Sequence, residues 1–273
     1  MRLETAMPLQ VDSGVANGTA FSVYGEGAPV VLIHGVGMAQ RVWEPQIAAL
    51  AVQHQVIVYD MLGHGDSKLP TEGATLADYA YQLAQLLDHL DIAEATVIGH
   101  SMGALVALEF AVLYPKRTVK VAALNAVYRR TPDQRRSVME RAHHLVETGV
   151  VATLESTIAR WFGDPVPEAL KESAALTRSL LSSVDLTGYA RTYRLFASQD
   201  EAHVARLPSL AVPALFMTAE FDSNSTPAMS RAMAEATPGS KCVVIPGERH
   251  MMGLTAPEEV NGHLLRFIDT PVL

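Results

Sequence analysis

Ser101 stands at the centre of Gly99-His100-Ser101-Met102-Gly103, between two segments of different character. The apolar run 95–98 precedes it and the helix-favouring stretch 104–110 follows it, so the sequence predicts a strand, a tight turn and a helix. The turn forces the serine backbone into a strained conformation, and the two glycines leave room for it. The bare pentapeptide also occurs by chance, but this context is typical of a nucleophilic serine.

A serine hydroxyl is a weak nucleophile at neutral pH, so it needs a histidine to take its proton and a carboxylate to orient that histidine. In one known chain order the acid follows the serine and the histidine comes last, each on a loop after a late strand. Asp222 and His250 follow the apolar runs 214–218 and 242–245 and fit this order. Glu220 is the close rival for the acid, and an ordinary loop aspartate is the structural alternative for Asp222. The sequence therefore predicts a triad of Ser101, Asp222 and His250.

Two backbone amides are candidates for binding the oxyanion that forms when a carbonyl is attacked. Met102 follows the nucleophile at the start of the predicted helix, where unpaired N–H groups and the helix dipole favour an anion. The second candidate is Val36 in His34-Gly35-Val36-Gly37, because the glycines of this loop allow the backbone to turn an N–H toward the serine. We interpret His34 itself as structural.

Other reactive side chains give weaker signals. Cys242 lies in an apolar run and is expected to be buried and inert. His143 and His144 are neighbours on a predicted helix and point about 100° apart, so we predict no metal site. His54 and His203 are expected to be solvated.

The composition indicates a globular protein without a membrane span or a bound polyanion. The 273 residues are 49% hydrophobic and 18% charged, the net charge is −8, and no apolar run approaches the roughly 18 residues of a membrane span. The negative charge would repel nucleic acid and anionic membranes. The first residues do not read as a secretion signal, so a cytoplasmic location is expected. The loop Gly63-His64-Gly65-Asp66-Ser67 lacks the lysine and the strand-to-helix context of a phosphate-binding loop, so nucleotide binding is not expected.

Short apolar runs alternate with helical patterns along most of the chain, which predicts a doubly wound α/β fold with a mostly parallel sheet. The expected strands are 21–24, 30–34, 56–60, 96–99, 119–124, 214–218 and 242–245. The expected helices are 42–50, 75–90, 102–114, 227–236 and 257–268.

The strand signal stops between 126 and 208, where the chain becomes helical, so we predict a core of residues 1–125 and 209–273 with a helical cap inserted at 126–208. Prolines near 132 and at 208–213 mark its ends. Several arginines lie near its start: Arg129, Arg130, Arg135, Arg136 and Arg141. They are either solvated or able to hold a substrate carboxylate by paired hydrogen bonds.

Taken together, these motifs resemble the α/β-hydrolase superfamily over nearly the full chain. The resemblance rests on His34-Gly35, on the run 60–67, on the serine pentapeptide, and on Asp222 and His250. Within the superfamily the chain is most similar to 3-oxoadipate enol-lactonases, through Arg160-Trp161-Phe162, Gly188-Tyr189-Ala190 and Ile245-Pro246-Gly247.

The resemblance implies a hydrolase of small carboxylic esters or lactones that works through an acyl-enzyme, without a cofactor. The cap would close over a small acyl substrate, with Trp161 either lining the pocket or packing the cap on the core. Several alternatives use the same residues: cleavage of a carbon–carbon bond or an amide, acyl transfer to an alcohol or to peroxide as in cofactor-free haloperoxidases, and a slow-turnover receptor. The oligomeric state stays open.

Overall fold

Eight strands form one sheet in the computed structural model, which describes residues 10–271. Their order across the sheet is β1-β2-β4-β3-β5-β6-β7-β8. Strands β1 and β2 pair antiparallel with each other, β2 pairs antiparallel with β4, and all further pairings are parallel. The strands are β1 (Gln10–Ala16), β2 (Thr19–Tyr24), β3 (Ala28–Ile33), β4 (His54–Tyr59), β5 (Ala95–His100), β6 (Thr118–Leu124), β7 (Ala214–Ala219) and β8 (Lys241–Ile245).

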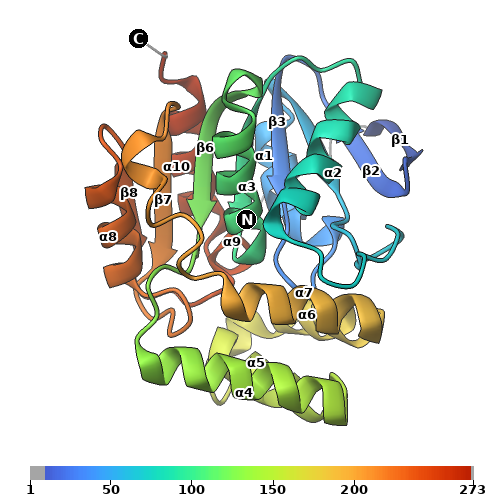
Figure 1. The fold of residues 1–273 in the computed structure, drawn as a ribbon, viewed down its shortest axis with the longest axis vertical. Coiled ribbons are helices and arrows are strands. Elements are labelled where there is room, and N and C mark those ends of the chain that lie inside the picture. The colour runs from blue at the N-terminus through green and yellow to red at the C-terminus, as the bar shows by residue number, and fades with distance from the viewer. Residues whose placement is uncertain (1–9, 272–273) are drawn as a thin grey trace.

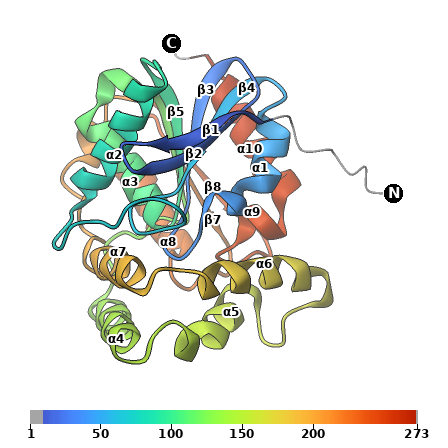
Figure 2. The ribbon, with the colours of Figure 1, turned by 90° about the vertical axis from the view of Figure 1, so that its right-hand side faces the viewer.

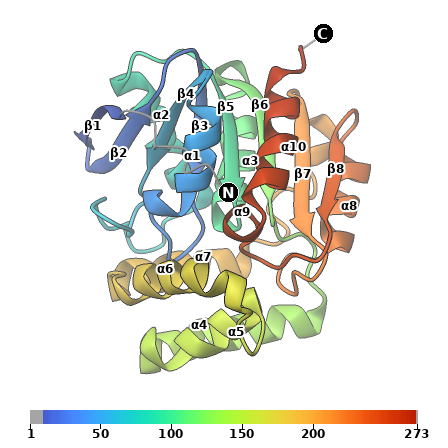
Figure 3. The same cartoon turned by 180° about the vertical axis from the view of Figure 1, so that it is seen from behind.

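Helices cover both faces of this sheet (Figures 1 and 3). One face carries α1 (Glu44–Leu50), α9 (Met252–Thr255) and α10 (Pro257–Asp269), and the other carries α2 (Leu76–His89), α3 (Met102–Leu113) and α8 (Pro227–Ala236). Residues 102–111 of α3 are all buried, because this helix lies between the sheet and α2. None of the helices described is long and apolar enough to cross a bilayer.

The sequence predicts the parallel part of the sheet well and misses its first edge. All seven expected strands and all five expected core helices are present, with ends shifted by up to two residues. Strand β1 is absent from the prediction because it is mostly exposed and contains Asp12, Ser13 and Gly14, which break the apolar pattern. The expectation that Cys242 is buried is wrong: its side chain is exposed, because β8 is the other edge strand and has one neighbour only.

Four helices lie across the carboxyl ends of the parallel strands (Figures 1 and 2). They are α4 (Pro132–Thr148), α5 (Leu154–Phe162), α6 (Lys171–Ser182) and α7 (Leu186–Ser198), and we call residues 126–208 the cap. Helix α4 begins with a capping box between Thr131 and Gln134 and has Pro132 in its first turn, two features that stabilise a helix start. The helices expected between 126 and 208 are therefore present, and their separation as a domain stays a prediction.

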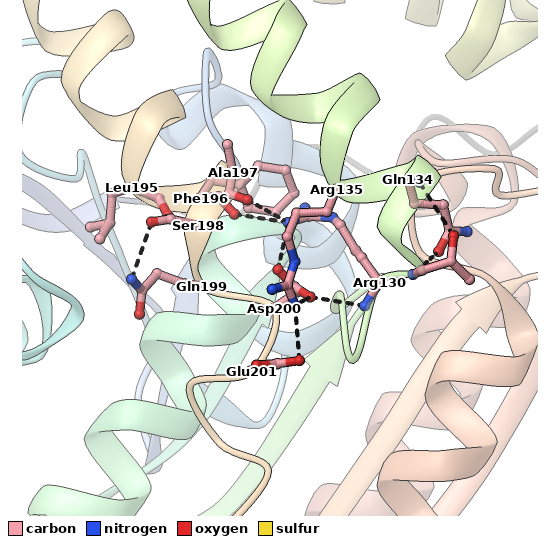
Figure 4. Close-up of polar contacts among 11 residues, drawn as sticks. Arg130, Gln134, Arg135, Leu195, Phe196, Ala197, Ser198, Gln199, Asp200 and Glu201 are labelled. Carbon is pink, nitrogen blue, oxygen red and sulfur yellow. Dashed lines mark hydrogen bonds and ion pairs between the residues drawn. The ribbon is translucent and has the colours of Figure 1, made fainter.

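Asp200 ties the two ends of the cap together (Figure 4). Its buried carboxylate accepts from the backbone N–H of Arg130 at 2.9 Å, lies 3.5 Å from the Arg130 guanidinium and 2.9 Å from that of Arg135. Arg130 also donates to the carbonyls of Phe196 and Ala197. Two of the arginines near the cap entrance are therefore engaged in an ion-pair network rather than simply solvated.

Candidate active site

Ser101 occupies a strained turn between β5 and α3. Its φ is 57° and its ψ is −115°, a conformation that side-chain-bearing residues rarely adopt. A Cβ on Gly99 would lie 1.9 Å from the carbonyl oxygen of Gly103, and a Cβ on Gly103 would lie 2.2 Å from that of Ile33. Both positions therefore exclude any side chain, which is the reason that the pentapeptide carries glycines there.

His250 and Asp222 form a buried pair on the loops after β8 and β7. Nδ1 of His250 lies 2.7 Å from Oδ2 of Asp222, and both residues are 3% exposed. The carboxylate accepts three further hydrogen bonds, from the side-chain amide of Asn125 to Oδ2 and from the backbone N–H groups of Asn224 and Ser225 to Oδ1. Burial alone would raise the pKa of Asp222, but His250 and these donors hold that pKa below its ordinary value. The acid is thus poised to stay ionised and to orient the imidazole.

One cavity of about 580 Å³ joins this pair to the serine. It lies between the cap and the carboxyl ends of the strands, and both Ser101 and His250 line it. The His100 ring packs 4.9 Å from the His250 ring, and its Nε2 lies 2.9 Å from the His250 carbonyl oxygen. The Ser101 hydroxyl makes no hydrogen bond to the imidazole within residues 10–271, and such bonds are often long before substrate binds.

The two amides expected at the oxyanion site lie next to the serine. Val36 lines the same cavity, and Met102 begins α3 directly after Ser101. Within the part of the chain that the structure describes, neither N–H donates to another protein group. Both donors are thus available to a ligand, as the start of a helix and a glycine-flanked loop would allow.

Trp161 on α5 packs against the imidazole ring of His250 in the core. Its ring lies 5.1 Å from the His250 ring, and the residue is 8% exposed and lines the cavity. The indole N–H is buried without a hydrogen-bond partner among the described residues. Trp161 therefore both packs the cap on the core and presents an unused donor next to the cavity, so the two interpretations of this residue are compatible.

Two arginines lining the cavity have no acidic partner. Arg141 donates to Tyr193 and Ser137, and Arg160 donates to Thr157. Neither forms an ion pair with the side chains that the structure describes, which leave out those of residues 146–148 and 151. Nε of Arg160 is buried and unpartnered. Burial and, after it, repulsion by Arg141 lower the pKa of Arg160.

The cavity wall holds little negative charge to balance these arginines. The Asp222 carboxylate, which does not line the cavity, attracts Arg160 and opposes the lowering of its pKa. Asp133 is the one acidic residue among the lining residues described, and it pairs with Arg136 on the exposed side of α4. The cavity is therefore cationic, which suits an anionic ligand. The sequence indicates Arg141 only as one of a group of arginines and gives no role to the Arg160 side chain, because the spacing of residues on two separate helices carries no signal that they face one cavity.

Two histidines expected to be solvated are buried. His203 is 3% exposed and pairs with Glu109 of α3 at 2.9 Å, and His54 is 6% exposed at the start of β4. His203 was misjudged because its partner lies 94 positions away in the chain. Neither residue lines the cavity.

Comparisons with known proteins identify the family of this fold. A family model described as the alpha/beta hydrolase fold matches residues 28–257. The chain is 36% identical, over 90% of its length and 92% of the relative's, to the (E)-2-((N-methylformamido)methylene)succinate hydrolase of Acinetobacter baylyi. It is 28% identical, over 86% of each chain, to 3-oxoadipate enol-lactonase 1 of the same organism. The crystal structure of the enol-lactonase from Burkholderia xenovorans LB400 superposes with a TM-score of 0.85 at 26% identity, covering 95% of this chain and 100% of that one.

Proposed function

We propose that this chain, which belongs to the α/β-hydrolase fold family, is a serine hydrolase of small acyl compounds that carry a carboxylate. The observation that carries the proposal is the placement of Ser101, on its strained turn, in one cavity with an imidazole that a buried Asp222 orients. Esters and lactones are the first substrate class, in line with the enol-lactonase relatives.

The proposed reaction runs through an acyl-enzyme. His250 takes the proton of Ser101 as the serine oxygen attacks the carbonyl carbon, and the Val36 and Met102 amides bind the oxyanion that forms. When the tetrahedral intermediate collapses, the bond to the leaving group breaks and the imidazolium returns the proton to the leaving oxygen. Water then attacks the acyl-enzyme, giving its proton to His250, and a second collapse releases the acid and restores the serine hydroxyl. Asp222 stays ionised throughout and stabilises the imidazolium.

The cationic cavity wall supports the carboxylate on the substrate. Arg141 and Arg160 lack acidic partners, so a substrate carboxylate would supply the missing negative charge and accept their N–H groups. The buried N–H of Trp161 adds a further donor near the reacting carbonyl. The name of the Acinetobacter baylyi hydrolase specifies a substituted succinate, which carries two carboxylates.

The nucleophile is tested by covalent labelling. A fluorophosphonate probe should label the wild-type protein and leave Ser101→Ala unlabelled, while the circular dichroism spectra of the two proteins coincide. Ser183, which is exposed on the cap and donates a hydrogen bond to the Leu180 carbonyl, offers a control serine, and Ser183→Ala should be labelled as fast as wild type. Normal labelling of Ser101→Ala would refute the assignment.

Substrate class is tested with a matched pair of esters. Mono-4-nitrophenyl adipate and 4-nitrophenyl hexanoate have the same six-carbon acyl chain and differ in the terminal carboxylate. We expect kcat/KM to favour the adipate by about tenfold or more, as one charge-assisted hydrogen-bonded contact provides. Equal kcat/KM values for the two esters would contradict the proposed recognition of a substrate carboxylate, but they would not contradict the assignment of Ser101 as the nucleophile.

Amide hydrolysis is the second candidate, favoured by the 36% identity to a hydrolase whose named substrate contains a formamido group. An amide demands more of His250, because the leaving nitrogen must be protonated as the carbon–nitrogen bond breaks. Steady-state assays on an ester and an amide with the same carboxylate-bearing acyl group separate the two chemistries. Turnover of the ester alone would exclude the amide, and fast turnover of either would exclude a slow-turnover receptor.

A further inference from the structure

Two buried histidines connect the loop that carries Val36 to a second loop. No residue of that second loop is among the residues that line the cavity. We call residues 34–38 the oxyanion loop and residues 60–67 the support loop. His34 lies on the oxyanion loop and His64 on the support loop, with their rings edge to face at a centroid distance of 5.2 Å. They are 0% and 1% exposed, and neither lines the cavity.

Backbone groups determine which nitrogen of His64 carries the proton. The N–H of Gly37 donates to Nε2 of His64 at 2.9 Å, so Nε2 must be the acceptor. The proton then resides on Nδ1, which lies 3.2 Å from the carbonyl oxygen of Leu62. Burial lowers the pKa of His64 to about 3, so the ring stays neutral and keeps its acceptor at working pH.

His34 makes the reciprocal connection. Its Nε2 accepts the N–H of Met61 at 3.0 Å, and its Nδ1, 2.8 Å from the Gly35 carbonyl oxygen, donates to that oxygen. The same oxygen accepts the N–H of Met38 at 3.2 Å. The C=O and N–H of a trans peptide point in opposite directions, so anchoring the Gly35 carbonyl aims the Val36 N–H the other way.

Val36 is therefore held on both sides. The peptide before it is fixed through the Gly35 carbonyl, and the peptide after it is fixed through the Gly37 N–H on His64. Without the second anchor, the bonds of Val36 and Gly37 would be restrained only by packing and by the hydrogen bonds to the Gly35 carbonyl, so the direction of the Val36 N–H would be less sharply defined.

We propose that His64 is a positioning residue, which aims the Val36 N–H at the oxyanion by accepting the N–H of Gly37. This inference rests on the proposed serine hydrolase function. It assigns to the support loop a role in transition-state stabilisation, although no residue of that loop reaches the cavity.

Two polar variants separate the functions of the two ring nitrogens. His64→Gln places an amide oxygen near the position of Nε2 and can still accept from Gly37, whereas His64→Asn reaches only the position of Nδ1 and retains the contact to Leu62. Removing one oxyanion donor typically lowers the rate by about 10²–10³-fold, and a donor that points in the wrong direction should cost less. We therefore expect His64→Asn to lower kcat on 4-nitrophenyl acetate by about tenfold to a hundredfold, with KM within about threefold of wild type. His64→Gln should keep most of the wild-type rate.

A sulfur-for-oxygen substrate reports on the oxyanion contact itself. O-4-nitrophenyl thioacetate has C=S in place of C=O, and its sulfur accepts hydrogen bonds poorly, so its hydrolysis depends little on the Val36 N–H. In His64→Asn the ester-to-thionoester rate ratio should therefore fall by about tenfold or more, and in His64→Gln it should stay near the wild-type value. A general loss of folded protein would lower both rates together.

His54→Leu is the matched control, because His54 is also buried but lies at the opposite end of β4. It should lower stability and leave the ester-to-thionoester ratio unchanged. An unchanged ratio in His64→Asn, or equal losses in the Asn and Gln variants, would overturn the positioning role. A wild-type protein that fluorophosphonate does not label would instead overturn the proposed function, so the two failures are distinguishable.

Discussion

The two walls of the cavity are built differently. On the core side, Ser101, Asp222 and His250 are at most 7% exposed, and the groups around them are fixed by backbone hydrogen bonds. On the cap side, Arg141 and Arg160 make few hydrogen bonds, all of them to hydroxyl groups, and form no ion pair with the side chains that the structure describes. The groups that we propose to react are thus preorganised, whereas the arginines that we propose to bind the substrate have hydrogen-bonding capacity left over for a ligand.

The difference follows from the elements that supply each wall. The core side is formed where adjacent parallel strands end at one edge of the sheet, at the point where strand order reverses between β3 and β5. Loops from several strands meet there and hydrogen-bond to one another. The cap side is formed by side chains from separate helices that line the cavity, so their positions depend on the length and charge of each side chain.

The largest expected effect is on the core side. Asp222→Asn should lower kcat by about 10⁴-fold with little change in KM, because a neutral amide neither stabilises the imidazolium nor selects the tautomer with the proton on Nδ1. Steady-state kinetics on 4-nitrophenyl acetate measure it. Glu220→Gln removes the rival acid, which accepts only the exposed N–H of Gly247, and should stay within about threefold of wild type. A large loss in the Glu220 variant with a small one in Asp222→Asn would exchange their roles.

The core wall should also make stability depend on pH. Burial lowers the pKa of His34 to about 4 and those of His64 and His100 to about 3, against an ordinary value of 6.5. Below pH 6.5 the unfolded chain therefore binds protons that the folded protein does not, and stability falls as the pH falls toward 4. Three such groups give a slope on the order of 4 kcal/mol per pH unit below about pH 6.

Urea unfolding at pH 7.5, 6.0 and 5.0 measures this slope. A free energy of unfolding that stays flat over this range would contradict the buried neutral state of the three rings. His64→Gln should reduce the slope by about a third, because one of three protonating groups is gone.

The contrast between the walls also explains what the sequence can predict. The serine turn, the two late-strand loops and the helix start at Met102 are local patterns, each readable within about ten residues, and the structure brings Asp222 and His250 together as expected. The partners of Asp200 and His203 lie on other elements of the fold, and Arg141, which lines the same cavity as Arg160, lies on another helix. Nothing in the local sequence of these residues therefore indicates burial or a shared cavity. Strand β1 was missed for the opposite reason, since an exposed edge strand needs no apolar pattern.

The Asp200 network holds the two ends of the cap together, and its contribution to stability can be measured by substitution. Asp200→Asn leaves the Arg130 guanidinium, whose side chain is 4% exposed, without its countercharge, and should lower the free energy of unfolding by about 3 kcal/mol. Chemical denaturation measures the change. Glu201→Gln is the control, because Glu201 pairs with the same Arg135 but is 63% exposed, and it should cost under about 1 kcal/mol. Equal costs in the two variants would mean that burial of the Asp200 pair contributes nothing.

The smallest expected effect distinguishes recognition from chemistry on the cap side. Arg160→Gln should lower kcat/KM for mono-4-nitrophenyl adipate by about tenfold to a hundredfold, the value of a charge-assisted hydrogen bond, and leave 4-nitrophenyl hexanoate within about threefold. Arg178→Gln is the control, since this arginine pairs with Glu155 at the cap surface and does not line the cavity. If Arg160→Gln slowed the hydrolysis of both esters equally, Arg160 would act on the chemical step or on folding. That result would contradict the proposal that this cap residue recognises the substrate carboxylate.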